Sequence, residues 1–324
     1  MTTSLSAELM QLLAQYHWCG QPRIIPGMSG MNNTTITLED DCERAIIRIY
    51  NNHADLSKLE FEHRMLLELQ RQSLSLALPV PQMNRMSSTI STLEDGRLAA
   101  RFCYIEGERP STSSKEQMTS LAAAAAELSV ALSKLTVAEV PAYSPYYELA
   151  DNYAPFNEEA VLRLLAHAEL AQLEDELLLI QRERSKLEQL QPELMALPQQ
   201  WIHGDINCSN SLAVGDRVTA ILDFEFVTRD MRVMELAVLL SELIKPQTEA
   251  LQEKLEAMQE AFVAIVPLHI SEIELLPELI KLRSVDVAMH FVQRFEQGLD
   301  QGNVLASIVE HAAFAINYVN KAMA

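Results

Sequence analysis

Residues 201–226 read WIHGDINCSNSLAVGDRVTAILDFEF, and this stretch decides how the rest of the chain is interpreted. A His-Gly-Asp sequence ends at Asp205, Asn210 comes five residues later, and Asp223 follows thirteen residues after Asn210. The apolar run at 218–222 has the pattern of a buried strand and leads directly into Asp223. The stretch therefore predicts a loop followed by a hairpin, with polar side chains presented where strands end.

The three polar residues have the spacing of a phosphoryl-transfer site. Protein kinases use an Asp that accepts the hydroxyl proton, an Asn five residues later that holds Mg²⁺, and a second Asp, followed by Phe, that also holds Mg²⁺. Such catalysis consists of positioning and charge neutralisation, and Mg²⁺ takes only one or two protein oxygens beside substrate phosphates. The sequence thus predicts Asp205 as the catalytic residue, Asn210 and Asp223 as Mg²⁺ ligands, and ATP as the phosphoryl donor.

Neighbouring polar residues receive supporting roles. His203 is expected to orient the loop rather than to transfer a proton. A metal site built from His203, Asp205 and Cys208 is the weaker alternative, because no second Cys or His stands at zinc spacing. Cys208, between the base and the metal ligand, predicts sensitivity to thiol reagents. Asp230 and Glu235 are expected to be scaffold, with Glu235 in the first turn of a helix. Three roles stay open for Glu225: metal binding, binding of a substrate amine, or a hydrogen bond within the site.

At this point the chain resembles a known family. The segment is similar to the Brenner-type motif of the aminoglycoside phosphotransferase and choline kinase superfamily: His-Gly-Asp, four variable residues, Asn, then Asp-Phe-Gly/Glu/Asp. A run at 266–283 resembles type II homoserine kinases and related bacterial small-molecule kinases. The resemblance implies an α+β, protein-kinase-like, two-lobed fold. Its small N-terminal lobe would hold an antiparallel β-sheet with a helix, and its larger C-terminal lobe would be mainly helical.

The N-terminal part has a nucleotide-binding pattern. Residues 33–38 and 45–50 alternate in polarity and predict a β-hairpin. Before it, a glycine-bearing loop would let backbone N–H groups approach phosphate oxygens, although such a loop is also common as an ordinary turn. The predicted phosphate-covering residues are Gly27, Ser29 and Gly30.

Two charged residues complete this nucleotide site. Arg48 stands where the strand-three Lys of a kinase stands, and its fork of donors suits phosphate. Residues 59–72 form an amphipathic helix on which Glu62 is expected to pair with Arg48, with Glu60 as the near alternative. The alternative for both is a solvated surface charge.

A hinge is expected next. Residues 86–93 and 98–104 predict two strands joined by an Asp-Gly turn, a strong hairpin signal. The end of the second strand resembles the superfamily's hinge, so the chain is divided into a nucleotide-binding lobe at 1–106 and a helical lobe at 107–324. The backbone groups expected to receive the adenine are those of Cys103, Tyr104 and Ile105.

The remainder is predicted to be helical apart from the catalytic hairpins. Leu, Ala and Glu recur at helical spacing in 118–135, 157–190, 234–244, 249–265, 271–295 and 303–323. The main interruption, 141–155, contains four tyrosines. Packing between helices is the preferred interpretation of these rings, and lining of a substrate pocket is the alternative.

Bulk properties limit the partners. A formal charge of −20 argues against nucleic acid and is compatible with a cationic or amine-bearing substrate. No apolar run reaches about 18 residues, so no membrane span is expected. Four scattered cysteines favour a reducing, cytoplasmic location. An oligomer remains open.

The sequence therefore predicts an ATP-dependent kinase that phosphorylates a hydroxyl of a small molecule such as homoserine or an amino sugar. Three alternatives share the motifs. The first is an antibiotic kinase of the aminoglycoside type. The second is a Ser/Thr protein kinase of the same superfamily. The third is a non-catalytic nucleotide-binding regulatory module, which the Arg at position 48 in place of Lys keeps open.

Overall fold

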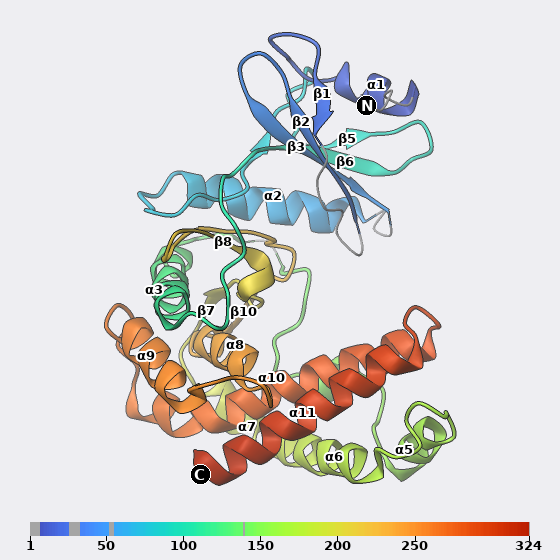
Figure 1. Ribbon diagram of the computed structural model, residues 1–324, viewed down its shortest axis with the longest axis vertical. Coiled ribbons are helices and arrows are strands. Elements are labelled where there is room, and N and C mark those ends of the chain that lie inside the picture. Colours follow the sequence, from blue (N-terminus) through green and yellow to red (C-terminus); the bar gives the residue numbers. More distant parts are fainter. Residues whose placement is uncertain (1–6, 26–32, 52–54, 139, 324) are drawn as a thin grey trace.

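The computed structural model describes residues 7–25, 33–51, 55–138 and 140–323. Its N-terminal part contains a six-stranded antiparallel sheet, which lies in the upper part of Figure 1 with most of the helices below it. The path of the sheet is β1-β2-β3-β6-β4, and β5 also pairs with β6. The strands are β1 (Arg23–Ile25), β2 (Asn33–Glu39), β3 (Arg44–Tyr50), β4 (Pro81–Gln82), β5 (Ser91–Thr92) and β6 (Leu98–Cys103).

Side chains alternate between the two faces of β3, so that the sheet packs against one helix on each face. Ile47 and Ile49 face the helix α1 (Ala7–Leu13) and the residues after it, and pack with Leu12 and Tyr16. The intervening residues of β3 point to the opposite face, where Tyr50 packs with Leu59 of the helix α2 (Leu56–Gln70). Because side chains alternate along a strand, Arg48 emerges on this second face, toward the rest of the molecule.

Helix α2 lies between the sheet and the helical part (Figure 1). It begins where the side chain of Asp55 accepts a hydrogen bond from the backbone N–H of Ser57. Leu59 contacts the sheet, whereas Met65 and Leu66 belong to the large core below. The same burial carries Glu62 inward, so that a charged residue sits where the two parts of the chain meet.

The helical part surrounds one apolar helix, α8 (Met234–Leu243), whose residues 234–240 are all buried. Long helices α10 (Ile270–Glu296) and α11 (Gly302–Ala322) run side by side below it (Figure 1). The other helices are α3 (Lys115–Leu132), α4 (Leu149–Asn152), α5 (Glu158–Leu165), α6 (Glu174–Gln189), α7 (Gln191–Met195) and α9 (Leu251–Val263). Within the described residues, no helix has the length and apolarity that crossing a membrane requires.

Two small antiparallel pairs frame the predicted catalytic segment. Strand β7 (Gln199–Ile202) pairs with β10 (Thr228–Met231), and β8 (Ser211–Val214) pairs with β9 (Arg217–Ile221). The segment after β6 is bonded to this hairpin, because the backbones of Glu108 and Ala213 exchange hydrogen bonds of 2.9 and 2.7 Å. Gly107 permits the approach: its φ is +145°, and an added Cβ would lie 2.9 Å from Leu212 Cβ.

The predicted hairpin at 33–38 and 45–50 corresponds to β2 and β3, and the predicted helices match observed ones with small shifts at their ends. The region 157–190 is two helices, α5 and α6. The predicted strand at 86–93 is wrong for most of its length. There the Asn84 carboxamide oxygen accepts from the backbone of Met86 and Ser88, which forms a turn, and only β5 remains as strand.

The expectation of four unpaired cysteines is also wrong. Cys19 and Cys42 form a disulfide, and Cys103 and Cys208 are free. Asp40 brings the pair together: its carboxylate accepts from the backbone N–H of Cys19 at 2.7 Å and of Cys42 at 2.9 Å. No residue spacing indicates this pair, because the contact is made by folding of the β2–β3 turn. The argument from unpaired cysteines for a reducing compartment therefore falls away.

The disulfide closes a loop that contains β1 and β2, so its removal should destabilise the sheet. We expect Cys42→Ser, or reduction by dithiothreitol, to lower the free energy of unfolding by about 3 kcal/mol, through the added chain entropy of the unfolded state. Thermal unfolding with and without reductant measures this difference. Cys103→Ser is the matched control, because Cys103 is a free cysteine of the same sheet. Equal melting temperatures for wild type and Cys42→Ser would contradict the bond.

Candidate active site

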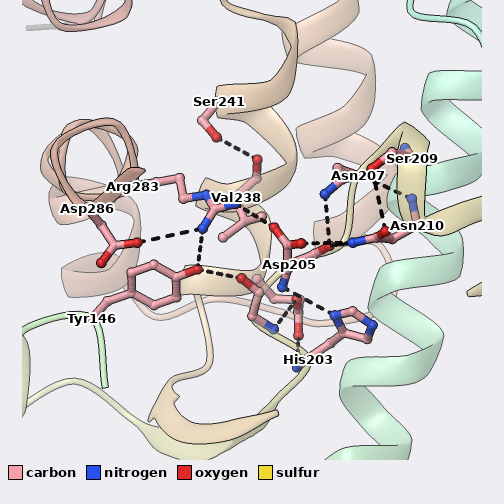
Figure 2. A network of polar contacts seen from close by, with 12 residues as sticks. Tyr146, His203, Asp205, Asn207, Ser209, Asn210, Val238, Ser241, Arg283 and Asp286 are labelled. Carbon is pink, nitrogen blue, oxygen red and sulfur yellow. Dashed lines mark hydrogen bonds and ion pairs between the residues drawn. The ribbon is translucent and has the colours of Figure 1, made fainter. Parts of the chain in front are cut away.

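The catalytic loop brings the predicted base and a predicted metal ligand into contact. Asn207 ends the loop by accepting from the backbone N–H of Ser209 at 2.8 Å and of Asn210 at 3.1 Å, which starts a 3₁₀ turn over Cys208–Asn210. This turn aims the Asn210 side chain back along the loop. Its Nδ2 donates to Asp205 Oδ2 at 2.8 Å and to the Asp205 carbonyl at 3.0 Å (Figure 2).

His203 is buried and holds the loop, as the sequence predicted. Its Nδ1 accepts from the backbone N–H of Asp205 at 3.2 Å, which leaves Nε2 to donate to the Leu222 carbonyl, 3.0 Å away. Burial lowers the pKa of His203, so the neutral ring that this tautomer requires is favoured. The ring therefore joins the catalytic loop to the end of β9.

Two buried carboxylates support the same region. Glu235, in the first turn of α8, accepts from the backbone N–H groups of His203 at 2.7 Å and Gly204 at 3.2 Å. Asp230 accepts from Tyr146 N at 2.6 Å, so it fixes the tyrosine-containing segment; the sequence had suggested the loop itself. Burial raises the pKa of each to about 7, and the backbone hydrogen bonds oppose that rise.

A cavity of about 350 Å³ lies between the sheet and the catalytic hairpin, and it gathers the described residues of the predicted nucleotide site. Sheet, α2, hinge and hairpin all contribute to its wall. Those residues are Arg48, Glu62, Cys103, Tyr104, Ile105, Asn210 and Asp223. The remaining predicted members, Gly27, Ser29 and Gly30, lie outside the described residues.

Inside this cavity Arg48 pairs with Asp223, with Nη1 and Oδ1 3.4 Å apart. Burial disfavours the charge on Arg48, but the carboxylates of Asp223 and Glu62 more than compensate and hold its pKa above the usual value. Burial raises the pKa of Glu62 to about 8, against the pull of Arg48. Glu62 thus acts on Arg48 electrostatically, while the ion pair that the structure gives Arg48 is with Asp223.

The donor set at Asn210 and Asp223 fits a hard cation. The Asn210 amide nitrogen is used by Asp205. The amide oxygen accepts only a long contact of 3.5 Å from Ser209 Oγ and keeps a lone pair for a ligand, and Asp223 adds carboxylate oxygens. Asp223 has a left-handed backbone with φ +65°, which is unusual for a residue with a side chain and is typical of functional sites. Nearby, burial and Asp223 raise the pKa of Glu225 to about 7.

A second cavity, of about 460 Å³, opens on the other side of Asp205. Its wall includes Tyr143, Tyr146 and Tyr153, so three of the four tyrosines line a pocket as well as pack. It also includes Arg283 and Asp286 of α10. Neither residue was expected from the sequence to take part in the site. The signal that could have indicated them is the recurrence of polar residues at positions 283, 286 and 290. These positions share one face of a helix, and many of the residues around them are apolar.

Asp205 therefore connects the walls of the two cavities. It lines the second cavity, while its hydrogen-bond partner Asn210 lines the first. A hydroxyl compound in the second cavity and a phosphate donor in the first would approach each other at this residue, which is the arrangement that an in-line transfer needs.

Cys208 is half-buried and its Sγ lies 3.8 Å from Met118 Sδ. Burial raises the pKa of its thiol to about 11. The reactive species is the thiolate, so this environment works against the predicted sensitivity to thiol reagents at Cys208.

Comparisons with known proteins agree on one family. A model of the "Phosphotransferase enzyme family" matches residues 24–265. The chain is 27% identical to a homoserine kinase of Afipia carboxidovorans over 212 residues, which covers 65% of this chain and 60% of that protein. A homoserine kinase of Methylorubrum populi is 26% identical over 245 residues, 74% of this chain and 70% of the relative. The chain thus spans about three-fifths of the Afipia protein.

Solved structures resemble the whole chain. An amicoumacin kinase, hAmiN, aligns with a TM-score of 0.68 at 13% identity and covers 95% of this chain and 93% of its own. A microcompartment-associated aminopropanol kinase aligns with a TM-score of 0.67 at 16% identity, covering 97% and 96%. These likenesses confirm the predicted α+β, two-lobed, kinase-like fold.

Glu235 should be required for the stability of the catalytic loop. In Glu235→Ala the buried N–H groups of His203 and Gly204 lose their acceptor, and we expect the free energy of unfolding to fall by about 3 kcal/mol. Glu235→Gln keeps one acceptor oxygen, so its free energy of unfolding should fall by less. Urea unfolding of both variants measures this, with exposed Glu249→Ala as the control. A Glu235→Ala protein as stable as the control would show that the loop does not depend on this carboxylate.

Proposed function

This chain belongs to the phosphotransferase enzyme family, and from that premise we propose that it is an ATP-dependent kinase acting on a hydroxyl of a small, amine-bearing molecule. One observation carries the proposal. The hydrogen bond between Asp205 and Asn210 connects the walls of two cavities, one lined by the predicted nucleotide-binding residues and one by aromatic and charged side chains. The division into lobes 1–106 and 107–324, and a cytoplasmic location, are parts of the same proposal.

In this proposal the nucleotide occupies the smaller cavity. The adenine lies against the backbone of Cys103, Tyr104 and Ile105, which line its hinge side. Arg48, on the α2-facing side of the sheet, binds phosphate oxygens in exchange for Asp223. Asn210 and Asp223 hold Mg²⁺, which would neutralise charge on the phosphate oxygens. Gly27, Ser29 and Gly30 supply backbone N–H groups above the phosphates.

The chemistry is then a direct transfer. The acceptor's hydroxyl oxygen forms a bond to the γ-phosphorus, the bond from that phosphorus to the β–γ bridging oxygen breaks, and ADP leaves. Asp205 takes the hydroxyl proton, because its carboxylate is the group of this loop that lines the acceptor cavity. His203 and Glu235 keep the loop in place through its backbone and take no part in proton transfer.

The acceptor cavity supports a small amine. Asp286 contributes a partly buried carboxylate, and rings including Tyr143 and Phe226 give the cavity aromatic walls, a combination that suits ammonium groups. Homoserine and amino sugars are acceptors of this kind. An antibiotic acceptor is the second candidate, favoured by a volume of about 460 Å³ and by similarity to the fold of an amicoumacin kinase. A cavity enclosed by α10 and the tyrosine segment is less suited to a protein substrate.

Replacing the proposed base should abolish transfer and spare nucleotide binding. We expect Asp205→Asn to lower kcat by about 10³-fold, within the usual contribution of general base catalysis, while the Kd for ATP stays within about two-fold. The assay is Mg²⁺-dependent ADP release with homoserine, amino sugars, choline and aminoglycosides as acceptors. Exposed Asp216→Asn, in the β8–β9 turn, is the control. Turnover by Asp205→Asn at the wild-type rate would refute the assigned base.

The nucleotide site can be tested through its free thiol. Cys103 is exposed and lines the cavity, whereas the thiol of Cys208 is half-buried with a pKa of about 11. We expect iodoacetamide at pH 7.5 to label Cys103 before Cys208, and MgATP to slow the labelling of Cys103 selectively. Peptide mass spectrometry separates the two sites. Labelling of Cys103 at the same rate with saturating MgATP would place the nucleotide elsewhere.

A further inference from the structure

The proposed base is held from both sides. Arg283 Nη2 donates to Asp205 Oδ1 at 2.5 Å, and Asn210 Nδ2 donates to Asp205 Oδ2 at 2.8 Å (Figure 2). Asn210 belongs to the same loop as Asp205, but Arg283 comes from the middle of α10, 78 residues further along the chain. The two contacts use one lone pair on each oxygen and fix the plane of the carboxylate. A second lone pair on each oxygen remains for an acceptor hydroxyl.

Arg283 also reaches the backbone of the loop. Its Nη1 donates to the hydroxyl of Tyr146 at 2.7 Å, and that hydroxyl donates to the Gly204 carbonyl at 2.5 Å. Burial raises the pKa of Tyr146 well above its usual value, so the hydroxyl keeps the proton it donates. Arg283, Tyr146, Gly204 and Asp205 thus form a closed ring of contacts, and Figure 2 shows that the tyrosine lies between α10 and the loop.

Two neighbouring carboxylates explain why this closed set of contacts contains an arginine. Asp205 and Asp286 both face Arg283, the second with 3.8 Å between Arg283 Nη1 and Asp286 Oδ2. Tyr153 donates to the other oxygen of Asp286 at 2.7 Å. The side chains of Arg283, Asp205 and Asp286 are only 15 to 19% exposed. Without the guanidinium, two partly buried carboxylates would repel each other with little water to screen them.

We propose that Arg283 is the positioning residue for Asp205. One nitrogen of its planar guanidinium binds the Asp205 carboxylate and the other binds the Tyr146 hydroxyl, and together these contacts hold the carboxylate toward the acceptor cavity. This role rests on the proposed function, because it assumes that Asp205 receives the acceptor's proton. Without Arg283, the Asp205 carboxylate keeps only its hydrogen bond from Asn210. A displacement of about 1 Å at a reacting group costs about 10²-fold in rate. The planar fork of Arg makes two separate contacts that the point charge of Lys cannot reproduce.

The test compares Arg283→Ala, Arg283→Lys and the wild type at saturating acceptor. We expect kcat to fall about 10²-fold in Arg283→Ala and less in Arg283→Lys, while the KM for ATP changes less than about two-fold. Added guanidinium chloride, at tens of millimolar, should restore about ten-fold of the lost kcat in Arg283→Ala and nothing in Asp205→Asn. Arg294→Ala is the matched control, since it removes a guanidinium–carboxylate pair of 2.5 Å from the same helix.

Two results would overturn the inference. One is a kcat for Arg283→Ala within about three-fold of the wild type. The other is a loss of kcat that neither guanidinium nor Arg283→Lys relieves, which would make the residue purely structural. If the wild type turns over none of the acceptors, the proposed function fails, and the inference is judged by thermal unfolding of Asp205→Ala, Arg283→Ala and the double variant. A smaller melting-temperature loss in the double variant than the sum of the single losses supports the pair, and additive losses overturn it.

Discussion

The buried carboxylate of Glu235 is the contact on which the catalytic loop depends. It sits in the first turn of α8, directly before the buried apolar residues 236–240, and its oxygens accept hydrogen bonds from the backbone N–H groups of two successive loop residues. A buried carboxylate is tolerated only where hydrogen bonds replace water, and buried N–H groups need an acceptor for the same reason. The carboxylate on the helix and the N–H groups of the loop are therefore hydrogen-bond partners, and a movement of the loop would leave both without a partner.

From this anchor, contacts extend toward the sheet. The ring of His203 packs edge-on against Phe224, with centroids 4.6 Å apart, and Phe224 is fully buried in the helical core. Glu62 of α2 comes next: burial raises the pKa of its carboxyl, and the backbone of Phe224 opposes that rise. Neighbouring groups thus connect α8, through the loop, to the face of β3 that carries Arg48. The position of the sheet is transmitted to the loop by packed groups, which move together because protein interiors are dense.

Local patterns in the sequence predicted much of this. The alternation in β2 and β3, the helical periodicity of α3, α8, α10 and α11, and the spacing of Asp205, Asn210 and Asp223 all concern residues that are near each other in the chain. The short strands β4 and β10 were missed because two to four residues form a strand only when a partner is already in place. The Cys19–Cys42 pair depends on a tertiary contact that no local pattern records, and the polar face at 283, 286 and 290 does not show which loop Arg283 and Asp286 contact.

The two cavities draw their walls from different parts of the chain. The proposed nucleotide cavity is bounded by the sheet, the hinge and the catalytic hairpin, whereas the proposed acceptor cavity is bounded largely by α10 and the tyrosine segment before α5. Among the described residues, the loop around Asp205 and Asn210 and the segment 222–228 contribute to both. Substitutions on a single helix, at positions such as 287 and 290, can therefore change which acceptor is bound during evolution. The residues proposed to bind the nucleotide phosphates need not change.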